Sequence, residues 1–357
     1  MATKPTISDV AALAGVSKGA VSFALNGLPG VSSHTRDRIR QAASELGFTP
    51  SHTARALSTR RSGNVGIVLA RRPEMLRADP FFPPFIAGVE SLLAPSGQSL
   101  MLRFVEPETE ADAYTELARA NRTDGVFLAD LRVDDPRPAL LTDLQLPYVS
   151  LNRPAAAGSG PAICLDDTVG IRAAVLHLID LGHRRIAHVA GPAEYLHANR
   201  RRDEWSAVLK EAGLQPGPVV QSDFTAAGGV RATEHLLDLA EPPSSILYAS
   251  DLMAIAGMSV AHRRGLRIPE DLSVIGYDDA ELSEHLHPPL TSVRTNAFGW
   301  GRAAAASLLA LLEHPAAQQD DVHLPPPEFI VRESTGPYRA SATPTAGRRP
   351  TTSKESR

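Results

Sequence analysis

The first fifty residues carry the spacing of short amphipathic helices. After Thr6, apolar residues recur at the i, i+3, i+4 and i+7 positions of one helical face, at Ile7, Val10, Ala11 and Ala14. Thr6 and Asp9 stand at the spacing of a capping box, which places the helix start at Thr6. Gly15 then interrupts the helix.

Ser17 is expected to cap a second helix, whose inward positions are Val21 and Leu25. Its outward positions are Lys18, Gly19, Ser22 and Phe23. Asn26-Gly27 predicts the helix end, and a third helix is expected over residues 33–46, ended by Gly47. Two helices joined by a glycine turn, the second short and polar outside, are typical of a helix-turn-helix. A small helical bundle with merely solvated basic residues is the alternative.

Residues 63–337 alternate between short apolar runs and helical spacing. Strands are expected at 65–69, 100–104, 125–128, 148–151, 185–189, 246–248 and 272–277. Helices are expected at 85–93, 111–119, 169–181, 200–212 and 253–264. This alternation predicts an α/β fold of mostly parallel, doubly wound sheets with helices on both faces. Its length favours two subdomains.

Composition excludes several classes of protein. Of 357 residues, 43% are apolar and 21% charged, a globular balance. The long apolar run Ala303–Leu312 falls short of the about 20 residues that span a membrane, and the N-terminus has no apolar signal region. Cys164 is the one cysteine, so an intrachain disulfide is impossible. We therefore expect a cytoplasmic protein that does not engage a membrane.

Charge is distributed unevenly along the chain. Residues 1–62 hold eight Lys and Arg against three acids, whereas the whole chain has a net charge of −4. The head is thus +5 and the remainder −9. A basic head on an acidic body indicates a polyanionic partner.

Two motifs raise the question of an enzyme. Gly15–Gly19 matches G-x-S-x-G, but a helix instead of a strand precedes Ser17, so a helix cap is the better reading. Glu284–His287 holds two histidines beside prolines without a third ligand at metal-site spacing. No phosphate-cradling glycine motif occurs in the sequence. We expect no catalytic activity, no metal and no cofactor.

Many short motifs resemble the LacI (lactose/purine repressor) family. In the head they include 6–11, 14–17, 21–22, 25–26, 31–32, 35–36 and 46–50. In the body they include 64–70, 79–82, 124–126, 177–186, 190–192, 273–279 and 289–293. The resemblance covers about residues 5–336. It implies a sequence-specific DNA-binding regulator with a two-lobed core like that of periplasmic binding proteins. We expect this regulator to be a repressor. A solute-binding protein sharing this core is the alternative, which the head and the missing signal peptide disfavour.

The resemblance implies roles in binding double-stranded operator DNA. Phosphate-facing positions are Thr6, Ser17, Ser22, Asn26, Ser32 and Thr35. Lys18, Gly19 and Phe23 face the bases, and Phe23 stands where many relatives carry arginine. Phenylalanine cannot read guanine bidentately but can contact thymine methyl groups, so we predict a different half-site there. Residues 51–62 resemble a hinge helix that wedges Leu57 into the minor groove.

The resemblance also implies an effector, a sugar or similarly polar metabolite, bound between the lobes. Its candidate contacts are Phe81, Phe82, Asn152, Asp166, His197, Arg201, Phe224, Ser250 and Asp278. The alternative for Phe81 and Phe82 is packing in the core. The alternative for Asp166 and Asp278 is helix capping. Asp251 is read as a cap.

The expected domains are a head at 1–50, the hinge at 51–62, a core at 63–337 and a disordered tail at 338–357. Lobe one comprises about 63–164 and 292–323, and lobe two about 165–291 and 324–337. The tail lacks a leucine heptad, and a half-site head reads a palindrome in pairs, so a homodimer is expected. The sequence does not tell whether the effector releases DNA or promotes binding.

Overall fold

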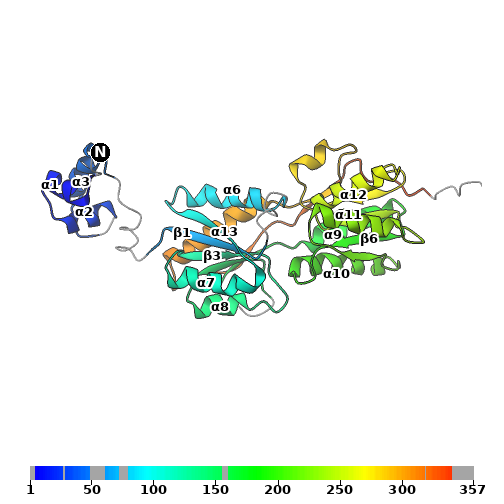
Figure 1. Ribbon diagram of the computed structural model, residues 1–357, viewed down its shortest axis with the longest axis horizontal. Coiled ribbons are helices and arrows are strands. Elements are labelled where there is room, and N and C mark those ends of the chain that lie inside the picture. Colours follow the sequence, from blue (N-terminus) through cyan, green and yellow to red (C-terminus); the bar gives the residue numbers. More distant parts are fainter. Residues whose placement is uncertain are drawn as a thin grey trace, which may run out of the picture. The chain divides into compact units, whose positions relative to one another are not determined.

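The computed structural model describes residues 5–26, 29–48, 61–71, 79–154, 160–317 and 319–339. Leu57 and the tail from 340 onward lie outside the described residues. The chain divides into two compact units (Figure 1). One comprises Met1–Leu76, Phe82–Cys164 and Ala297–Leu324, and the other Arg77–Phe81, Leu165–Asn296 and Pro325–Arg357.

Three N-terminal helices form a core of their own. They are α1 (Ile7–Ala14), α2 (Lys18–Leu25) and α3 (Ser33–Glu45). Val10, Val21 and Ile39, one from each helix, are fully buried in this core. The chain bends by 101° between α1 and α2, as in a helix-turn-helix. The predicted pattern of inward positions is thus confirmed, and we call these helices the headpiece.

Local signals fix where the headpiece helices begin and end. The Thr6 N–H donates to the Asp9 carboxylate over 2.8 Å, which confirms the capping box. Ser17 caps α2 by accepting from the Ala20 N–H over 3.2 Å, so the G-x-S-x-G serine is a helix cap. Gly15 has a φ of 62°, which favours glycine at a helix end.

Lobe one, the first unit without the headpiece, is built on a six-stranded parallel sheet. Its strands, in spatial order, are β11 (Val322–His323), β5 (Ala162–Cys164), β4 (Tyr148–Leu151), β3 (Gly125–Leu128), β1 (Asn64–Leu69) and β2 (Ser99–Phe104). Helices α6 (Phe82–Leu93) and α13 (Ala297–Glu313) pack together on one face. Helices α7 (Glu110–Arg119) and α8 (Arg137–Asp143) cover the other face, and the short η1 (Pro107–Thr109) leads into α7 (Figure 1).

Lobe two, the second unit, repeats this doubly wound plan. Its parallel sheet is ordered β7 (Val219–Gln221), β6 (Ile186–Ala190), β8 (Ser245–Tyr248) and β9 (Ser273–Ile275). Helices α9 (Thr168–Asp180) and α10 (Leu196–Glu211) pack on one face, and α11 (Ala226–Leu237) and α12 (Asp251–Arg263) on the other (Figure 1). A short helix η2 (Glu281–His285) and an antiparallel pair, β10 (Ser292–Arg294) with β12 (Glu328–Ile330), complete it.

The predicted parallel α/β core is confirmed, while some boundaries differ. Residues 292–296, expected in lobe one, group with lobe two, because β10 pairs with β12 and the Asp278 N–H donates to the Val293 carbonyl over 2.9 Å. The expected tail also starts too early. The Tyr338 N–H donates to the Leu181 carbonyl over 2.8 Å, so the described fold continues to 339. Helix α6 begins at Phe82, three residues before its expected start.

Candidate DNA-binding and effector sites

The outer face of α2 carries the predicted base-reading residues. Lys18 and Gly19 are exposed, and 46% of Phe23 is exposed, which confirms its outward direction. The Phe23 ring lies beside Gly30, where an added Cβ would stand 3.6 Å from the ring. Gly30 has a φ of 108°, a conformation that favours glycine. The turn before α3 thus supports an aromatic ring that still presents much of its surface.

The predicted phosphate-facing side chains cluster at helix ends. Ser32 accepts from the Thr35 N–H over 3.2 Å at the start of α3. The Asn26 amide donates to the Ser22 hydroxyl over 3.3 Å at the end of α2. Thr6, Ser17 and Ser32 are helix N-caps, where backbone N–H groups favour anions, whereas Ser22 and Asn26 lie towards the C-terminal end of α2. Their contacts with DNA stay predictions.

Arg201 is the centre of the effector candidates in lobe two. Its guanidinium carbon stands 3.5 Å from the centroid of the Tyr277 ring, and its Nη1 donates to the Ala249 carbonyl over 3.1 Å. Its Nε lies 3.5 Å from an oxygen of Asp167. Tyr277, Ala249 and Asp167 are the sequence neighbours of the predicted Asp278, Ser250 and Asp166. The arginine on α10 therefore gathers segments that follow β5, β8 and β9.

Acidic groups around Arg201 differ from exposed carboxyls. Burial raises the pKa of Asp167, and the Arg201 guanidinium opposes this rise. Burial also raises the pKa of Asp278 well above its ordinary value, and the charges of Asp251 and Asp79 add to the effect. A desolvated cation among such carboxyls provides both donors and acceptors for a polar ligand.

Three stacked rings lie in the same lobe. The His197 ring, one helical turn before Arg201, stacks on Phe224 with a centroid distance of 5.7 Å and an interplanar angle of 18°. Tyr195 stacks on His197 at 5.6 Å and 12°. Phe224 has a φ of 60°, and a Cβ on Gly191 would come within 2.1 Å of its ring. Glycine at 191 thus creates the space that the Phe224 ring occupies.

Two other predicted contacts in lobe two, Asp166 and Ser250, have structural roles at helix starts. Asp166 is exposed and accepts from the Thr168 N–H and hydroxyl at 3.1 and 2.6 Å, which supports the capping alternative. Ser250 caps α12 by accepting from the Met253 N–H over 3.4 Å. Asp278 does not cap a helix, since it lies beyond β9 with a φ of 106°.

Two further predictions concern Asp251, which follows Ser250, and Phe81. Asp251 is not the expected cap, because it accepts from the Ser283 and Ser292 hydroxyls, each over 2.6 Å. The Phe81 N–H donates to the Asp79 carboxylate over 2.9 Å, and its side chain is half-buried. This local bond leaves the role of the Phe81 ring a prediction.

Lobe one contains the other two predicted contacts. Phe82 is only 2% exposed, which favours the core alternative over stacking on a ligand. Asn152 directly follows β4 with a φ of 71°, and its N–H donates to the Ile163 carbonyl over 2.9 Å. It therefore stands at the carboxyl end of the sheet, where ligands of such folds bind.

Sequence reasoning missed Asp167, Tyr195 and Tyr277. The resemblance pointed to the adjacent residues Asp166 and Asp278, and only the fold shows that Asp167 and Tyr277 contact Arg201. Tyr195 stacks on the predicted His197, a contact that the sequence pattern did not indicate. Within the described ranges, no three His, Cys, Asp or Glu side chains are grouped as metal ligands, and no single helix is long and apolar enough to cross a membrane.

Two family models match the chain. Residues 6–51 match bacterial regulatory proteins of the lacI family, and residues 175–335 match a periplasmic binding protein-like domain. The first match covers the headpiece and the second most of lobe two. The sequence resemblance is thereby confirmed in both parts.

Characterised relatives align over most of the chain. The HTH-type transcriptional regulator CelR of Thermobifida fusca is 37% identical over 86% of this chain and 91% of its own length. The transcriptional repressor CytR of Escherichia coli K12 is 32% identical over 93% and 97%.

Solved structures give the same result. A CelR–cellobiose complex superposes with a TM-score of 0.71 at 35% identity, covering 92% of this chain and 99% of that one. The lac repressor dimer bound to operator and the anti-inducer ONPF superposes with a TM-score of 0.80 at 29% identity, covering 94% and 100%. The chain belongs to the LacI family of DNA-binding bacterial transcriptional regulators.

Proposed function

We propose that this protein represses transcription in the cytoplasm as a homodimer, and that a sugar controls its affinity for a pseudo-palindromic operator. It acts by binding, without catalysis. The observation that carries the effector proposal is the arrangement around Arg201. A fixed guanidinium, the buried carboxyl of Asp167 and a stack of three rings combine polar and apolar surfaces in one lobe. Sugar rings present both kinds of surface.

Cellobiose or a related glucose disaccharide is our choice of effector. The reason is the similarity to the CelR–cellobiose complex over 92% of this chain. We expect the sugar to change operator affinity by a coupling free energy of about 1–3 kcal/mol, about 5- to 150-fold. Coupling is reciprocal, so operator DNA must change sugar affinity by the same factor. That the sugar also contacts lobe one stays a prediction.

Calorimetry with cellobiose, glucose and maltose tests the effector proposal. Arg201→Met removes charged hydrogen bonds and is expected to weaken binding of the preferred sugar about tenfold to a hundredfold. Arg202→Met is the matched control, since Arg202 lies next on α10 and pairs with Asp203 at the surface. Equal sugar affinity of the two variants would contradict the proposed site.

Phe23 provides the test of operator reading. An electrophoretic shift of the protein with its own upstream DNA identifies the half-site. Replacing thymine by uracil there removes only the 5-methyl group, so a position read by Phe23 loses affinity. Phe23→Arg is expected to shift preference towards guanine, and unchanged preference would contradict this reading. Steep salt dependence is expected for both proteins, because phosphate contacts dominate affinity.

A further inference from the structure

Residues 61–63, which we call the entry segment, bring the chain from the predicted hinge into lobe one. They lead directly into Asn64, the first residue of β1, and Gly125 begins the neighbouring parallel strand β3. Asp124 stands just before β3, and its N–H donates to the Asn64 carbonyl over 2.8 Å. The entry segment thus lies at the edge where the strands begin. Ligands of such folds bind at the opposite, carboxyl edge.

The Asp124 carboxylate binds two successive residues of the entry segment. Its Oδ1 accepts from the Ser62 N–H over 2.6 Å and from the Ser62 hydroxyl over 3.0 Å. Its Oδ2 accepts from the Gly63 N–H over 2.9 Å. Gly63 has a φ of 72°, a conformation that favours glycine. Successive N–H groups around such a residue form a concave anion site, and the Asp124 carboxylate occupies it.

Arg61 attaches the entry segment to α13 as well. Its Nη2 donates to the Leu312 carbonyl over 2.6 Å. Leu312 lies in the last turn of the helix, where carbonyls lack a partner within the helix and favour a cation. Helix α13 has no basic residue in its own last turn. Arg61, 251 positions away in the sequence, therefore supplies the positive charge at this helix end.

Helix α13 connects this contact with a crossover between the lobes. The chain passes from lobe two at Asn296 to lobe one at Ala297, the first residue of the helix. A Cβ on Gly301 would stand 2.1 Å from the Phe85 carbonyl oxygen, so α13 packs closely on α6 and moves with lobe one. Its 17 residues span about 25 Å. A rotation of lobe one by about 10° at the crossover would displace the far end of α13 by about 4 Å.

We propose that Arg61 and Asp124 are positioning residues that transmit the effector signal from lobe one to the DNA-binding part of the chain. Arg61 fixes the entry segment to the far end of α13, and Asp124 fixes it to the start of β3. A segment held at both points follows a rotation of lobe one instead of absorbing it. The inference rests on the proposed sugar control, and it names the residues through which that control reaches the operator.

The coupling factor of the full-length protein tests this inference. We define it as the ratio of the operator dissociation constants with and without saturating cellobiose. Arg61→Met removes the bond to α13, and Asp124→Asn places an NH2 group where one oxygen accepted an N–H. Each is expected to change the coupling factor at least threefold towards 1, while calorimetry gives a sugar affinity within twofold of the unmodified protein. Arg61→Lys, which can still donate to the Leu312 carbonyl, should retain more coupling than Arg61→Met.

Two control variants match these changes in charge. Arg122 lies two residues before Asp124, is 59% exposed and pairs with Glu116. Asp112 is exposed on α7 of the same lobe. Arg122→Met and Asp112→Asn should leave both the coupling factor and the sugar affinity unchanged, because neither side chain binds the entry segment.

Salt dependence separates positioning from direct contact with DNA. Removing an arginine that binds a phosphate reduces the slope of log affinity against log salt by about 1. Arg61→Met should keep the slope of the unmodified protein. Coupling factors of Arg61→Met and Asp124→Asn within twofold of the unmodified protein, or a slope reduced by about 1 in Arg61→Met at unchanged coupling, overturn this inference alone. If the unmodified protein binds operator but cellobiose, glucose and maltose leave its affinity unchanged, the proposed sugar control fails and this inference fails with it.

Discussion

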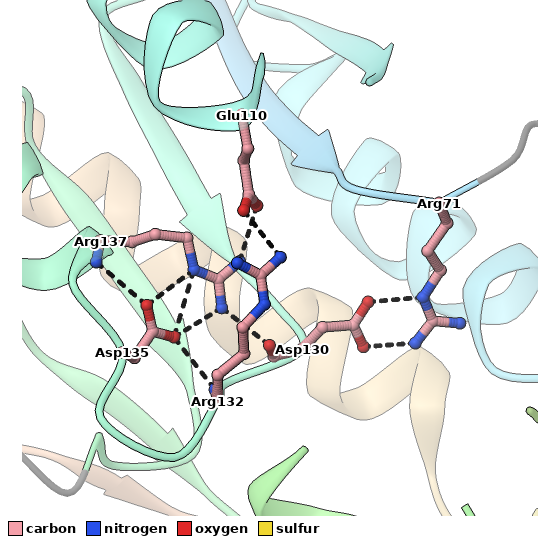
Figure 2. A network of polar contacts seen from close by, with 6 residues as sticks. All are labelled: Arg71, Glu110, Asp130, Arg132, Asp135 and Arg137. Atoms are coloured by element: carbon pink, nitrogen blue, oxygen red, sulfur yellow. Dashed lines mark hydrogen bonds and ion pairs between the residues drawn. The ribbon is translucent and has the colours of Figure 1, made fainter. Parts of the chain in front are cut away.

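Replacing Arg137 by methionine is a severe test of how lobe one is stabilised. The Arg137 residue is 3% exposed, and its guanidinium contacts Asp135, Glu110 and the Asp130 carbonyl (Figure 2). Methionine retains most of the aliphatic volume but none of the donors. The variant therefore leaves two buried carboxylates without their main cation.

The remaining partners set the size of the effect. Asp135 keeps the N–H groups of residues 132 and 137, at 3.1 and 3.0 Å, and Glu110 keeps Arg132 at 2.7 Å. Removing one partner of a buried pair costs about 3–5 kcal/mol of unfolding free energy. A carboxyl that has lost its cation can instead bind a proton. Protonating a carboxyl of ordinary pKa at pH 7.5 costs about 5 kcal/mol, so the loss of unfolding free energy per carboxyl cannot exceed this value.

Protonation also gives the prediction a pH signature. In the unmodified protein, Arg137 lowers the pKa of Asp135 against the effect of burial, so this pair stabilises the fold above the unfolded pKa. In Arg137→Met, the pKa of Asp135 in the folded state should lie above its pKa in the unfolded state. The carboxyl then destabilises the fold at high pH, and this penalty fades as the pH falls through the raised pKa.

Thermal unfolding at pH 7.5 and pH 5 measures both effects. A loss of this size lowers Tm by about 6–20 °C at pH 7.5, and by less at pH 5. Arg122→Met is the control, since Arg122 is 59% exposed and 3.4 Å from Glu116, an arrangement worth at most about 1 kcal/mol. Glu110→Gln added to Arg137→Met should recover part of the loss. A smaller Tm shift than that of the control, or one that grows on acidification, would refute the reasoning.

Three more substitutions test other parts of the core. Burial lowers the pKa of His188 to about 4. Between pH 7.5 and pH 5 the unmodified protein should therefore lose about 2 kcal/mol of unfolding free energy relative to His188→Leu. Urea denaturation at both pH values checks this, and equal losses in the two proteins would contradict it. A Cβ on Gly88 would lie 2.1 Å from the Phe298 carbonyl oxygen, so Gly88→Ala should cost about 1–3 kcal/mol, measured in the same assay. Gly191→Ala should displace the Phe224 ring and weaken sugar binding by calorimetry, while sugar-free operator affinity stays unchanged.

The elements that the sequence predicted best are those with strong local signals. The apolar spacing after Thr6 and the cap at Ser17 placed α1 and α2 correctly, and the short apolar runs placed β3 and β4 at their observed bounds. In such segments the pattern of burial follows directly from side-chain period and capping.

The missed elements depend on contacts that the local pattern does not contain. Helix α11 was not predicted, since Gly228-Gly229 is unfavourable in a helix interior. The fold requires glycine there, because a Cβ on Gly229 would stand 2.7 Å from the Met253 carbonyl oxygen of α12. Strand β7 has three residues, of which the first and last are exposed, and its sequence Val-Val-Gln does not alternate between apolar and polar residues.

In both lobes, the sequence indicated the right segment of the candidate site but not always the right side chain. Phe82 and Asp166 match the family by residue type, but packing uses the ring of the first and helix capping uses the carboxylate of the second. Groups near them, Arg71 and Asp167, are the charged ones that stand at the sheet edge or beside Arg201. A side chain already committed to a core or a cap has little binding capacity left for a ligand. Sequence motifs therefore indicated the segments of the candidate site, whereas the choice of side chain within each segment required the fold.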